Sequence, residues 1–213
     1  MLDGGFCGGE VSLVYGEADT GKTTLAIQCA VNLARSGKRT IYIDSDRSLS
    51  STRLSQISGY DLEVLRNIII FTPENFDVQT QIVESLPHYV SSQVALIAVD
   101  TVTSLYRLDV GDSDKTFKLN RQLNRQLAYF SNIAKEGGVA TLLLSQVRSL
   151  MMDSPEVEPV ANRLLRFWSN NIVQLRATPM VGVKEAVLEL RMRRKVQKKC
   201  HFRTGEAGIE DLK

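Results

Sequence analysis

A segment near the start of the chain has the residue types and the spacing of a phosphate-binding loop. Residues 16–23 read GEADTGKT, which matches the pattern G-x-x-x-x-G-K-[ST]. Gly16 and Gly21 allow the backbone to curl so that its N–H groups point at phosphate oxygens. Lys22 can reach the β- and γ-phosphates of a nucleotide, and the Thr23 hydroxyl can ligate Mg²⁺. The segment predicts a nucleoside triphosphate site formed by Gly16, Glu17, Ala18, Asp19, Thr20, Gly21, Lys22, Thr23 and Thr24.

The elements expected on either side of this segment agree with that prediction. Residues 11–15 form a short apolar run of strand-forming types, and residues 22–36 carry apolar side chains at helical spacing. A helix that begins inside the loop adds the positive end of its dipole to the phosphate site. With a strand before the loop and a helix after it, a chance match is a poor explanation. ATP is the expected nucleotide, and GTP is the open alternative.

An acidic residue closes another apolar run, at residues 94–99. In a parallel sheet the end of this strand lies at the carboxyl edge, beside the phosphate-binding loop. Asp100 can there hold the water shell of Mg²⁺. Thr23 and Asp100 are therefore the predicted metal residues.

Three further polar residues follow expected strands and are candidates for the chemistry. Asp44 and Asp46 come after the strand at residues 40–43, and either can orient an attacking water as a general base. Gln146 follows the strand at residues 139–144 and can sense the γ-phosphate. Each of the three is as compatible with a solvated turn as with a site residue.

Strands and helices alternate through most of the chain, which favours a mainly parallel α/β sheet covered by helices on both faces. Further helices are expected at residues 49–57, 78–90 and 113–136, and a further strand at residues 67–71. Residues 151–159 are polar and acidic and contain proline, so we expect a loop there. Antiparallel strands at the sheet edge are expected at residues 171–177, 185–193 and 199–204.

The composition is that of an ordinary globular protein. The chain has 213 residues, 43% hydrophobic and 23% charged, with a net charge of +2, and this length favours one domain over residues 1–213. Three cysteines and two histidines, none at metal-ligand spacing, argue against a disulfide framework or a zinc site. No apolar run approaches the roughly 20 residues that cross a membrane, and no secretory signal is evident. We therefore expect a cytoplasmic protein without a membrane partner.

Clusters of cationic side chains mark three candidate surfaces for DNA phosphates. One lies on the helix at residues 113–136, opposite its apolar stripe, another flanks the segment after Gln146, and the third lies near the C-terminus. Their members are Lys118, Arg121 and Arg125, then Arg148, Arg163 and Arg166, then Arg194, Lys195, Lys198 and Lys199. Clustered cations neutralise backbone phosphates without reading sequence. Solvated charged faces are the alternative interpretation.

The order of the motifs resembles that of RecA-family recombinases, most closely the archaeal RadB group. The matching segments are LDGG at 2–5, GEV at 9–11, YIDSD at 42–46, VDTVTSLYR at 99–107, LSQV at 144–147 and RLLRFWS at 163–169, together with the phosphate-binding loop. The resemblance implies a RecA-like core that binds ATP and Mg²⁺. It also implies that the segments after Arg107 and after Gln146 line a DNA path, which adds Arg107 to the DNA candidates. The implied partners are the main archaeal recombinase and a Holliday-junction resolvase.

Departures from the family pattern lower the ATPase activity that we expect. The family places a Glu where this chain has Asp46, so the carboxylate lies one methylene closer to the backbone. Because catalytic groups need placement within a fraction of an ångström, we expect slow hydrolysis. Glu17 and Asp19 add two acids near the phosphates, which weakens nucleotide affinity unless they point away. The chain begins almost at the ATPase core, so we do not expect the helical N-terminal DNA-binding domain or the assembly motif of full recombinases.

Neither expected DNA loop offers an evident aromatic platform for stacking bases. Phe117 is a candidate for one, but we expect it in the core. We expect Phe167 and Trp168 to pack on the sheet.

These observations favour an ATP- and DNA-binding accessory protein of homologous recombination and DNA repair. Lys22, Asp46 and Gln146 would be its catalytic residues, with weak hydrolysis, and its DNA would be single-stranded or branched. The alternatives are an active strand-exchange recombinase, a small-molecule phosphotransferase and a nucleotide-binding regulatory module. The phosphotransferase would need an arginine-rich lid, and the segment at residues 151–159 is acidic instead. A homo-oligomer and association with the nucleoid are compatible with this prediction.

Overall fold

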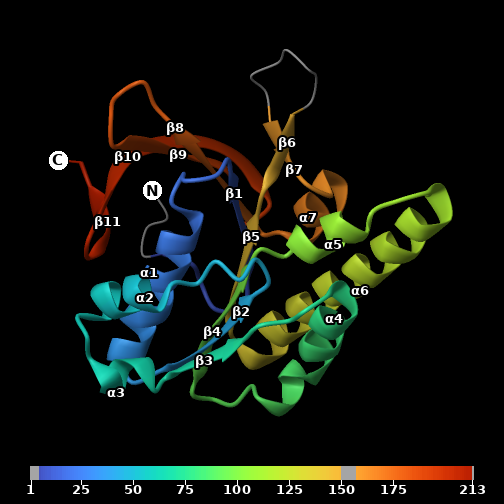
Figure 1. The fold of residues 1–213 in the computed structure, drawn as a ribbon, viewed down its shortest axis with the longest axis horizontal. Helices are drawn as coiled ribbons and strands as arrows, with labels where there is room; N and C mark the ends of the chain where they lie inside the picture. Colours follow the sequence, from blue (N-terminus) through green and yellow to red (C-terminus); the bar gives the residue numbers. More distant parts are fainter. Residues whose placement is uncertain (1–4, 150–156, 213) are drawn as a thin grey trace.

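A nine-stranded sheet forms the centre of the computed structural model, which describes residues 5–149 and 157–212 (Figure 1). The strand order is β11-β10-β9-β8-β1-β5-β4-β2-β3. Neighbouring strands from β8 to β3 in this order are parallel, and β9, β10 and β11 are antiparallel to their neighbours. The strands are β1 (Val11–Gly16), β2 (Arg39–Asp44), β3 (Ile68–Phe71), β4 (Val94–Asp100), β5 (Ala140–Ser145), β8 (Asn171–Ala177), β9 (Val183–Arg191), β10 (Arg194–Gly205) and β11 (Gly208–Asp211). The predicted fold class is confirmed.

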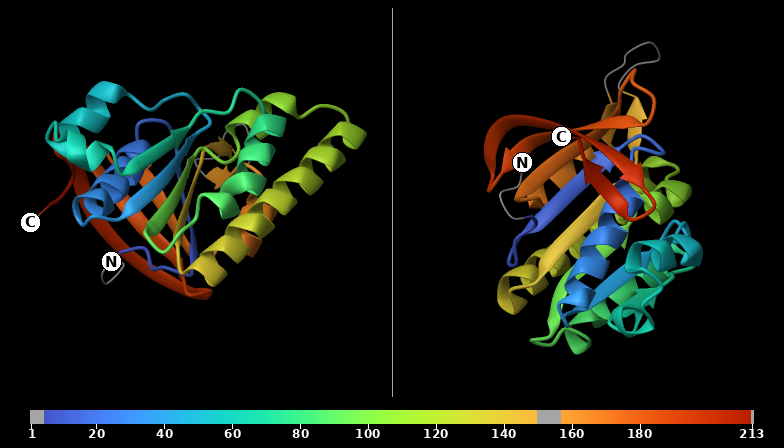
Figure 2. Two further views of the ribbon diagram at one scale, coloured as in Figure 1. Left: turned by 90° about the horizontal axis from the view of Figure 1, so that it is seen from below. Right: turned by 90° about the vertical axis from the view of Figure 1, so that its left-hand side faces the viewer.

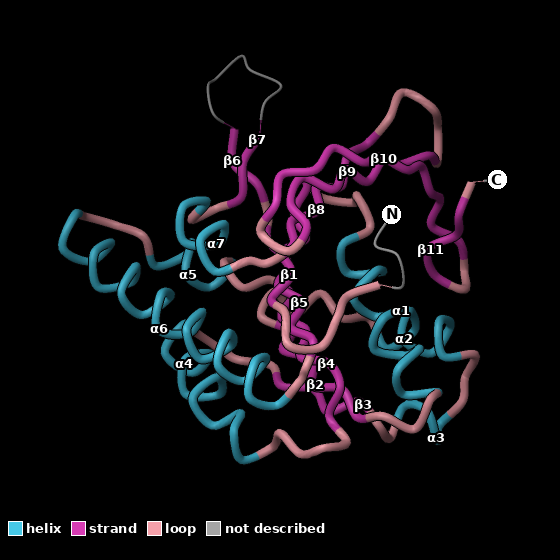
Figure 3. Tube along the Cα trace, turned by 180° about the vertical axis from the view of Figure 1, so that it is seen from behind, coloured by secondary structure: helices cyan, strands magenta, loops and turns pink. Residues whose placement is uncertain are grey.

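Helices cover both faces of the sheet (Figures 1 and 2). Ile27 of α1 and Ile57 of α2 belong to the apolar core on one face, and Phe76 of α4 and Leu123 of α6 belong to the core on the other. Seen from behind, α4 and α6 lie on one side of the strands and α1, α2 and α3 on the other (Figure 3). The helices are α1 (Lys22–Arg35), α2 (Ser51–Ser58), α3 (Leu62–Leu65), α4 (Phe76–Ser85), α5 (Ser104–Asp109), α6 (Ser113–Gly137) and α7 (Asn162–Trp168), with a 3₁₀ turn η1 (Leu86–His88) after α4.

Helix α6 has a capping residue at each end and an apolar stripe along the face that packs on the sheet. Asp112 caps its first turn by accepting a 2.9 Å hydrogen bond from the Lys115 backbone N–H. Gly138 ends the helix with a left-handed φ of 63°. The predicted apolar stripe is buried against the sheet and consists of Leu119, Leu123, Leu127, Phe130 and Ala134. Across the described residues, no helix combines the length and apolar character that a membrane span requires.

The carboxyl ends of the parallel strands meet at one edge of the sheet. Asp44 of β2 is in register with Asp100 of β4, and Tyr15 of β1 is in register with Ser145 of β5. The phosphate-binding loop, the segment after β2 and Gln146 therefore all leave the sheet at the same edge. This edge positions the candidate site.

Predictions for the second half of the chain are wrong in part. The loop predicted at residues 151–159 includes β7 (Val157–Pro159), which pairs antiparallel with β6 (Val147–Ser149), while residues 151–156 lie outside the described residues. Strand β10 is longer than predicted, because its ladder with β9 continues through polar positions, and β9 begins and ends two residues earlier than predicted. The helices α3, α5 and α7 and the strand β11 were not predicted, since elements of four to seven residues are too short to show a periodic pattern.

Candidate functional site

The phosphate-binding loop connects β1 to α1 and depends on both of its glycines. Gly16 lies so close to β8 that a Cβ atom there would overlap with the Leu175 carbonyl oxygen. Gly21 has a φ of 96°, in the left-handed region that favours glycine. The Thr20 hydroxyl donates a 2.8 Å hydrogen bond to the Glu17 carbonyl and ties the loop together. The curl of the loop therefore requires glycine at both positions.

The Lys22 side chain lies inside the loop. Its ammonium donates hydrogen bonds to the carbonyl oxygens of Gly16 at 2.9 Å and Glu17 at 2.6 Å, and the residue is 7% exposed. Burial lowers the pKa of Lys22, while the carboxylates of Asp100 and Asp46 oppose this effect. An anion inside the loop would give this buried ammonium a charged partner.

The first turn of α1 offers backbone N–H groups that no side chain caps. Gly21 occupies the N-cap position without a side-chain hydrogen bond, and the first turn contains no acidic residue. The leading N–H groups of a helix lack partners within the helix, and the helix dipole adds positive charge at this end. These donors and Lys22 fit the phosphates of a nucleotide.

Asp100 ends β4 beside the loop and is 1% exposed. The Tyr42 hydroxyl donates a 2.7 Å hydrogen bond to its carboxylate. Burial raises the pKa of Asp100, whereas hydrogen bonds from Thr23 and Tyr42 lower it. The two residues predicted for the metal therefore lie together, and their oxygens suit Mg²⁺. The described residues contain no group of three or more His, Cys, Asp or Glu that could hold a metal, so Mg²⁺ here would also need water and phosphate oxygens.

The two acids after β2 have different surroundings. Asp44 is buried, and its carboxylate accepts hydrogen bonds from the backbone N–H groups of Ser48 at 3.0 Å and Leu49 at 3.1 Å. Asp46 instead accepts a 3.0 Å hydrogen bond from the side-chain amide of Gln146. Asp44 therefore stabilises the turn after β2, and Asp46 is the acid that faces the other candidate residues.

Gln146 joins Asp46 to helix α5. Its amide nitrogen donates to Asp46, and its amide oxygen accepts a 3.0 Å hydrogen bond from the Arg107 guanidinium. Because both ends of the amide have partners, its orientation is fixed. We call Arg107, Gln146 and Asp46 the relay.

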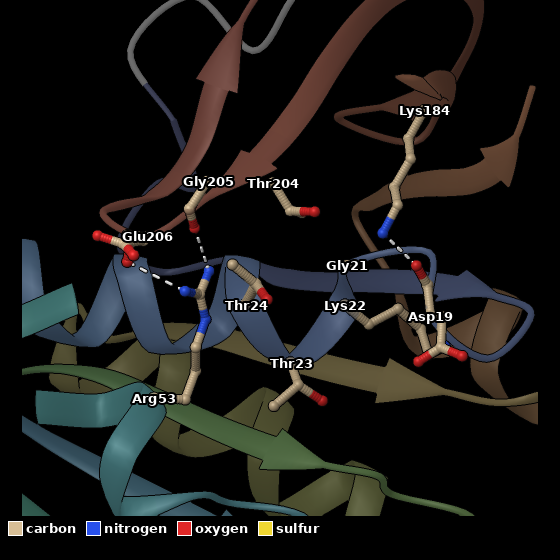
Figure 4. A pocket seen from close by; sticks show the side chains of 10 residues that line it. All are labelled: Asp19, Gly21, Lys22, Thr23, Thr24, Arg53, Lys184, Thr204, Gly205 and Glu206. Atoms are coloured by element: carbon tan, nitrogen blue, oxygen red, sulfur yellow. Dashed lines mark hydrogen bonds between the residues drawn. The ribbon is translucent and has the colours of Figure 1, made fainter. Parts of the chain in front are cut away.

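A cavity of about 620 Å³ opens between the loop and the C-terminal strands (Figure 4). Arg53 of α2 donates hydrogen bonds across it to the carbonyl oxygens of Gly205 at 2.7 Å and Glu206 at 3.0 Å. Its lining residues are Asp19, Gly21, Lys22, Thr23, Thr24, Arg53, Lys184, Thr204, Gly205 and Glu206. The sequence did not reveal Arg53 or Lys184, because no local motif marks residues that reach the site only through the tertiary fold. Tyr42 lies in the family-matching segment at 42–46 but was not predicted as a site residue, because its contact with Asp100 joins two strands.

Glu17, Ala18 and Asp19 form the exposed tip of the loop. Of the two acids, Asp19 lines the cavity, and its carboxylate raises the pKa of Lys22. The expected weakening of nucleotide affinity therefore rests mainly on Asp19.

A larger cavity of about 980 Å³ lies beside the relay, bounded by α5, α6, α7 and the hairpin of β6 and β7. Three DNA candidates line it, namely Arg107, Arg148 and Arg163. Arg148 forms an ion pair with Glu158 at 2.6 Å. Arg163 is exposed and has no ion pair with another described residue. We call this cavity, with its three arginines, the arginine groove.

The basic face of α6 forms a separate surface. Lys118, Arg121 and Arg125 are exposed and line a groove of about 540 Å³ that Thr80 of α4 also lines. Arg125 is already paired with Glu84 at 2.7 Å. The structure thus keeps these three cations together, as their spacing predicts, but outside the arginine groove.

The remaining DNA candidates do not join the arginine groove. Arg166 is paired with Glu189 at 2.7 Å. Strand β10 approaches the phosphate-binding loop only at its end, so Arg194 and Lys195 at its start lie toward the opposite edge of the sheet. The other two cations of the C-terminal cluster, Lys198 and Lys199, lie along β10, and Lys199 is paired with Glu185 at 3.4 Å.

Two predictions about aromatic residues are wrong. Phe117 is 65% exposed and Phe167 is 64% exposed, so neither packs in the core. Phe117 lies near the start of α6, where the helix extends beyond the sheet (Figure 1). Trp168 does pack against the core, and its indole N–H donates a 2.9 Å hydrogen bond to Asn124.

Known proteins share this architecture and much of the sequence. The family model described as Rad51 matches residues 1–212. The DNA repair and recombination protein RadB of Thermococcus kodakarensis is 35% identical over 218 residues, which cover 100% of this chain and 94% of that protein. RadB of Methanococcus maripaludis strain C7 is 32% identical over 212 residues, or 99% of this chain and 95% of that protein. A crystal structure of the RadB recombinase, 32% identical, matches 100% of this chain and 95% of its own with a TM-score of 0.82. The chain therefore belongs to the Rad51 family of RecA-like proteins.

Proposed function

We propose that this protein is an ATP- and DNA-binding accessory protein of homologous recombination and DNA repair, with slow ATP hydrolysis. The observation that carries the proposal is the relay, because its hydrogen bonds run from Asp46, whose carboxylate acts on the Lys22 ammonium, to Arg107 in the arginine groove. The names of the relatives, DNA repair and recombination proteins, support the cellular role.

The loop residues, the first turn of α1 and Lys22 are the proposed ligands of the ATP phosphates. Thr23 would bind Mg²⁺, and Asp100 would hold its water shell while Tyr42 fixes the carboxylate. When bound, Mg²⁺ supplies positive charge that neutralises the phosphates. The adenine base of ATP would lie toward Arg53, because the cavity extends from the loop in that direction.

Asp46 is the proposed general base for hydrolysis. Its carboxylate is oriented by Gln146 and lies near enough to Lys22 to affect the ammonium's pKa. Its side chain is one methylene shorter than the family's Glu, which would hold the carboxylate back from an attacking water. Slow hydrolysis would keep the ATP-bound form present for long periods.

ATP would act on DNA binding through the relay. A γ-phosphate would offer the Gln146 amide a second charged acceptor, which would compete with the Asp46 carboxylate for its N–H groups. Movement of Gln146 would change the position of Arg107, which lines the arginine groove. ATP would thereby favour one arrangement of the cations that contact DNA phosphates.

The proposed partners are DNA, single-stranded or branched, and, by family resemblance, the main archaeal recombinase and a Holliday-junction resolvase. The proposed place of action is the nucleoid, and a homo-oligomer is compatible with it. An active strand-exchange recombinase is the competing function. It would form filaments on single-stranded DNA and hydrolyse ATP faster there than on other DNA.

Replacing Asp46 with Glu is expected to raise ATP turnover about tenfold, which corresponds to about 1.4 kcal/mol in the activation barrier. The added methylene brings the carboxylate closer to the attacking water, while Gln146 can still donate to it. The measurement is steady-state phosphate release at saturating Mg-ATP by the wild type and by Asp46→Glu. Asp46→Asn is the matched control and should be slower than both.

The same assay separates the candidate functions when it is run with no DNA and with single-stranded, double-stranded or branched DNA. The accessory role predicts slow turnover that differs little among these arms. Strong stimulation by single-stranded DNA would favour the strand-exchange recombinase. A rate for Asp46→Glu at or below the wild-type rate would refute the geometric reason for slow hydrolysis.

A further inference from the structure

Lys184 lies far from the phosphate-binding loop in sequence but meets its tip in the fold. It belongs to β9, where it is in register with Ala177 of β8 and Phe202 of β10. Its ammonium donates a hydrogen bond to the backbone carbonyl of Asp19 and lines the same cavity as Lys22 (Figure 4). Strand β9 therefore brings a second lysine to the cavity of about 620 Å³ beside the phosphate-binding loop.

The residue that Lys184 holds has an unusual backbone conformation. Asp19 has a φ of 58°, in the left-handed region that non-glycine residues seldom adopt. Such conformations persist when surrounding contacts hold them, and the Lys184 hydrogen bond is one such contact. The path of the loop at its tip determines which way its N–H groups face, so this contact bears on phosphate binding.

Lys184 also offsets charge. The Asp19 carboxylate lines the cavity and interacts electrostatically with both Lys22 and Lys184. Burial lowers the pKa of Lys184, and the Asp19 carboxylate opposes that effect. An uncompensated carboxylate at this position would repel the phosphates of a nucleotide. The tip of the loop therefore carries an acid, Asp19, and Lys184 of β9 offsets its negative charge.

We propose that Lys184 is a nucleotide-positioning residue, which holds the tip of the loop through the Asp19 carbonyl and offsets the Asp19 carboxylate so that a nucleoside triphosphate can bind. The inference rests on the proposed ATP binding. It assigns the site a functional group from outside the loop motif. It also explains how a loop that contains Glu17 and Asp19 can accept a triphosphate.

The test is a double-mutant cycle on Lys184 and Asp19, with the Kd for Mg-ATP measured by titration calorimetry. Lys184→Met is expected to weaken binding about tenfold, because it removes the hydrogen bond and the charge together. Lys184→Arg should stay within about threefold of the wild type, since it retains both. Asp19→Asn alone should strengthen binding about threefold, and in the Lys184→Met background it should recover most of the loss.

The control is Lys38→Met, which removes an exposed lysine beyond the far end of α1 and should leave the Kd unchanged. Thermal unfolding of each variant checks that it folds, and Asp19→Asn tests the charge argument even if Lys184→Met does not fold. Wild-type affinity in Lys184→Met, or an unchanged Kd in Asp19→Asn, would overturn the inference while ATP binding stands. If the wild type itself does not bind Mg-ATP, the proposed function fails instead.

Discussion

Replacing Lys22 with alanine is expected to lower the affinity for Mg-ATP at least 100-fold. Its ammonium is buried inside the loop and is held only by the carbonyl oxygens of Gly16 and Glu17 among the described residues. Phosphate oxygens would replace these neutral acceptors with charged ones, and each such hydrogen bond contributes about 1.5–3 kcal/mol. Two of them account for a loss of at least ~100-fold at 1.4 kcal/mol for each factor of ten.

Titration calorimetry with Mg-ATP measures this loss, and Lys38→Ala is the matched control. Lys38 is exposed and lies beyond the other end of α1, so its removal should leave the Kd unchanged. Lys22→Ala also leaves the loop carbonyls without their donor, so thermal unfolding is needed to confirm that the variant remains folded. Wild-type affinity in a folded Lys22→Ala variant would show that the loop is not the nucleotide site.

Neutralising two arginines of the arginine groove is expected to weaken DNA binding ~10–100-fold at moderate salt. The variant is Arg107→Gln with Arg163→Gln, because both residues line the groove and neither has an acidic partner among the described residues. Each lost phosphate contact should also lower the slope of log K against log salt by about one, so the double variant should lose about two. The loss should be similar for different base sequences, since phosphate contacts do not read bases.

Fluorescence anisotropy with a labelled oligonucleotide, titrated at several salt concentrations, measures both quantities. The control is Arg194→Gln with Lys195→Gln, which removes the same charge toward the opposite edge of the sheet. The control should keep most of its affinity and its salt slope. A larger loss of DNA affinity in the control than in the groove variant would indicate that DNA binds to β10 and not to the arginine groove.

The sequence predicts the elements that hold the phosphate site better than it predicts the residues that complete it. A buried parallel strand such as β4 is apolar up to its last residue, and a phosphate-binding loop followed by a helix has a fixed spacing, so both can be recognised in the sequence. Arg53 and Lys184 are ordinary surface residues of a helix and a strand in the sequence. They become site residues only because the fold brings β9 and the end of β10 beside the loop.

Local hydrogen bonds also decide between residues that look alike in the sequence. Asp44 and Asp46 follow the same strand, and only the backbone N–H groups of Ser48 and Leu49 show that Asp44 is committed to a turn. The basic residues behave in the same way. Arg125, Arg148, Arg166 and Lys199 look available in the sequence, yet each has a carboxylate partner in the fold.

Three carboxylates of the site affect how it can bind a nucleotide. Asp19, Asp46 and Asp100 all contribute to the charge around Lys22, whose pKa they raise against the effect of burial. With this many carboxylates, the proposed binding of a triphosphate would require compensating cations, for which Mg²⁺ and Lys184 are the candidates. This distribution of charge agrees with the proposal that ATP is held mainly as a ligand and is hydrolysed slowly.

If ATP controls DNA binding through the relay, as proposed, DNA affinity must depend on the nucleotide state of the protein. The Kd for single-stranded and for branched oligonucleotides would be measured without nucleotide, with Mg-ADP and with a non-hydrolysable Mg-ATP analogue at one salt concentration. We expect DNA affinity at least ~5-fold higher with the analogue, which is the lower end of ordinary coupling between two sites. Gln146→Ala should remove that difference while it still binds the analogue. Equal Kd values in all three states, in protein that binds the analogue, would contradict control of DNA binding by ATP.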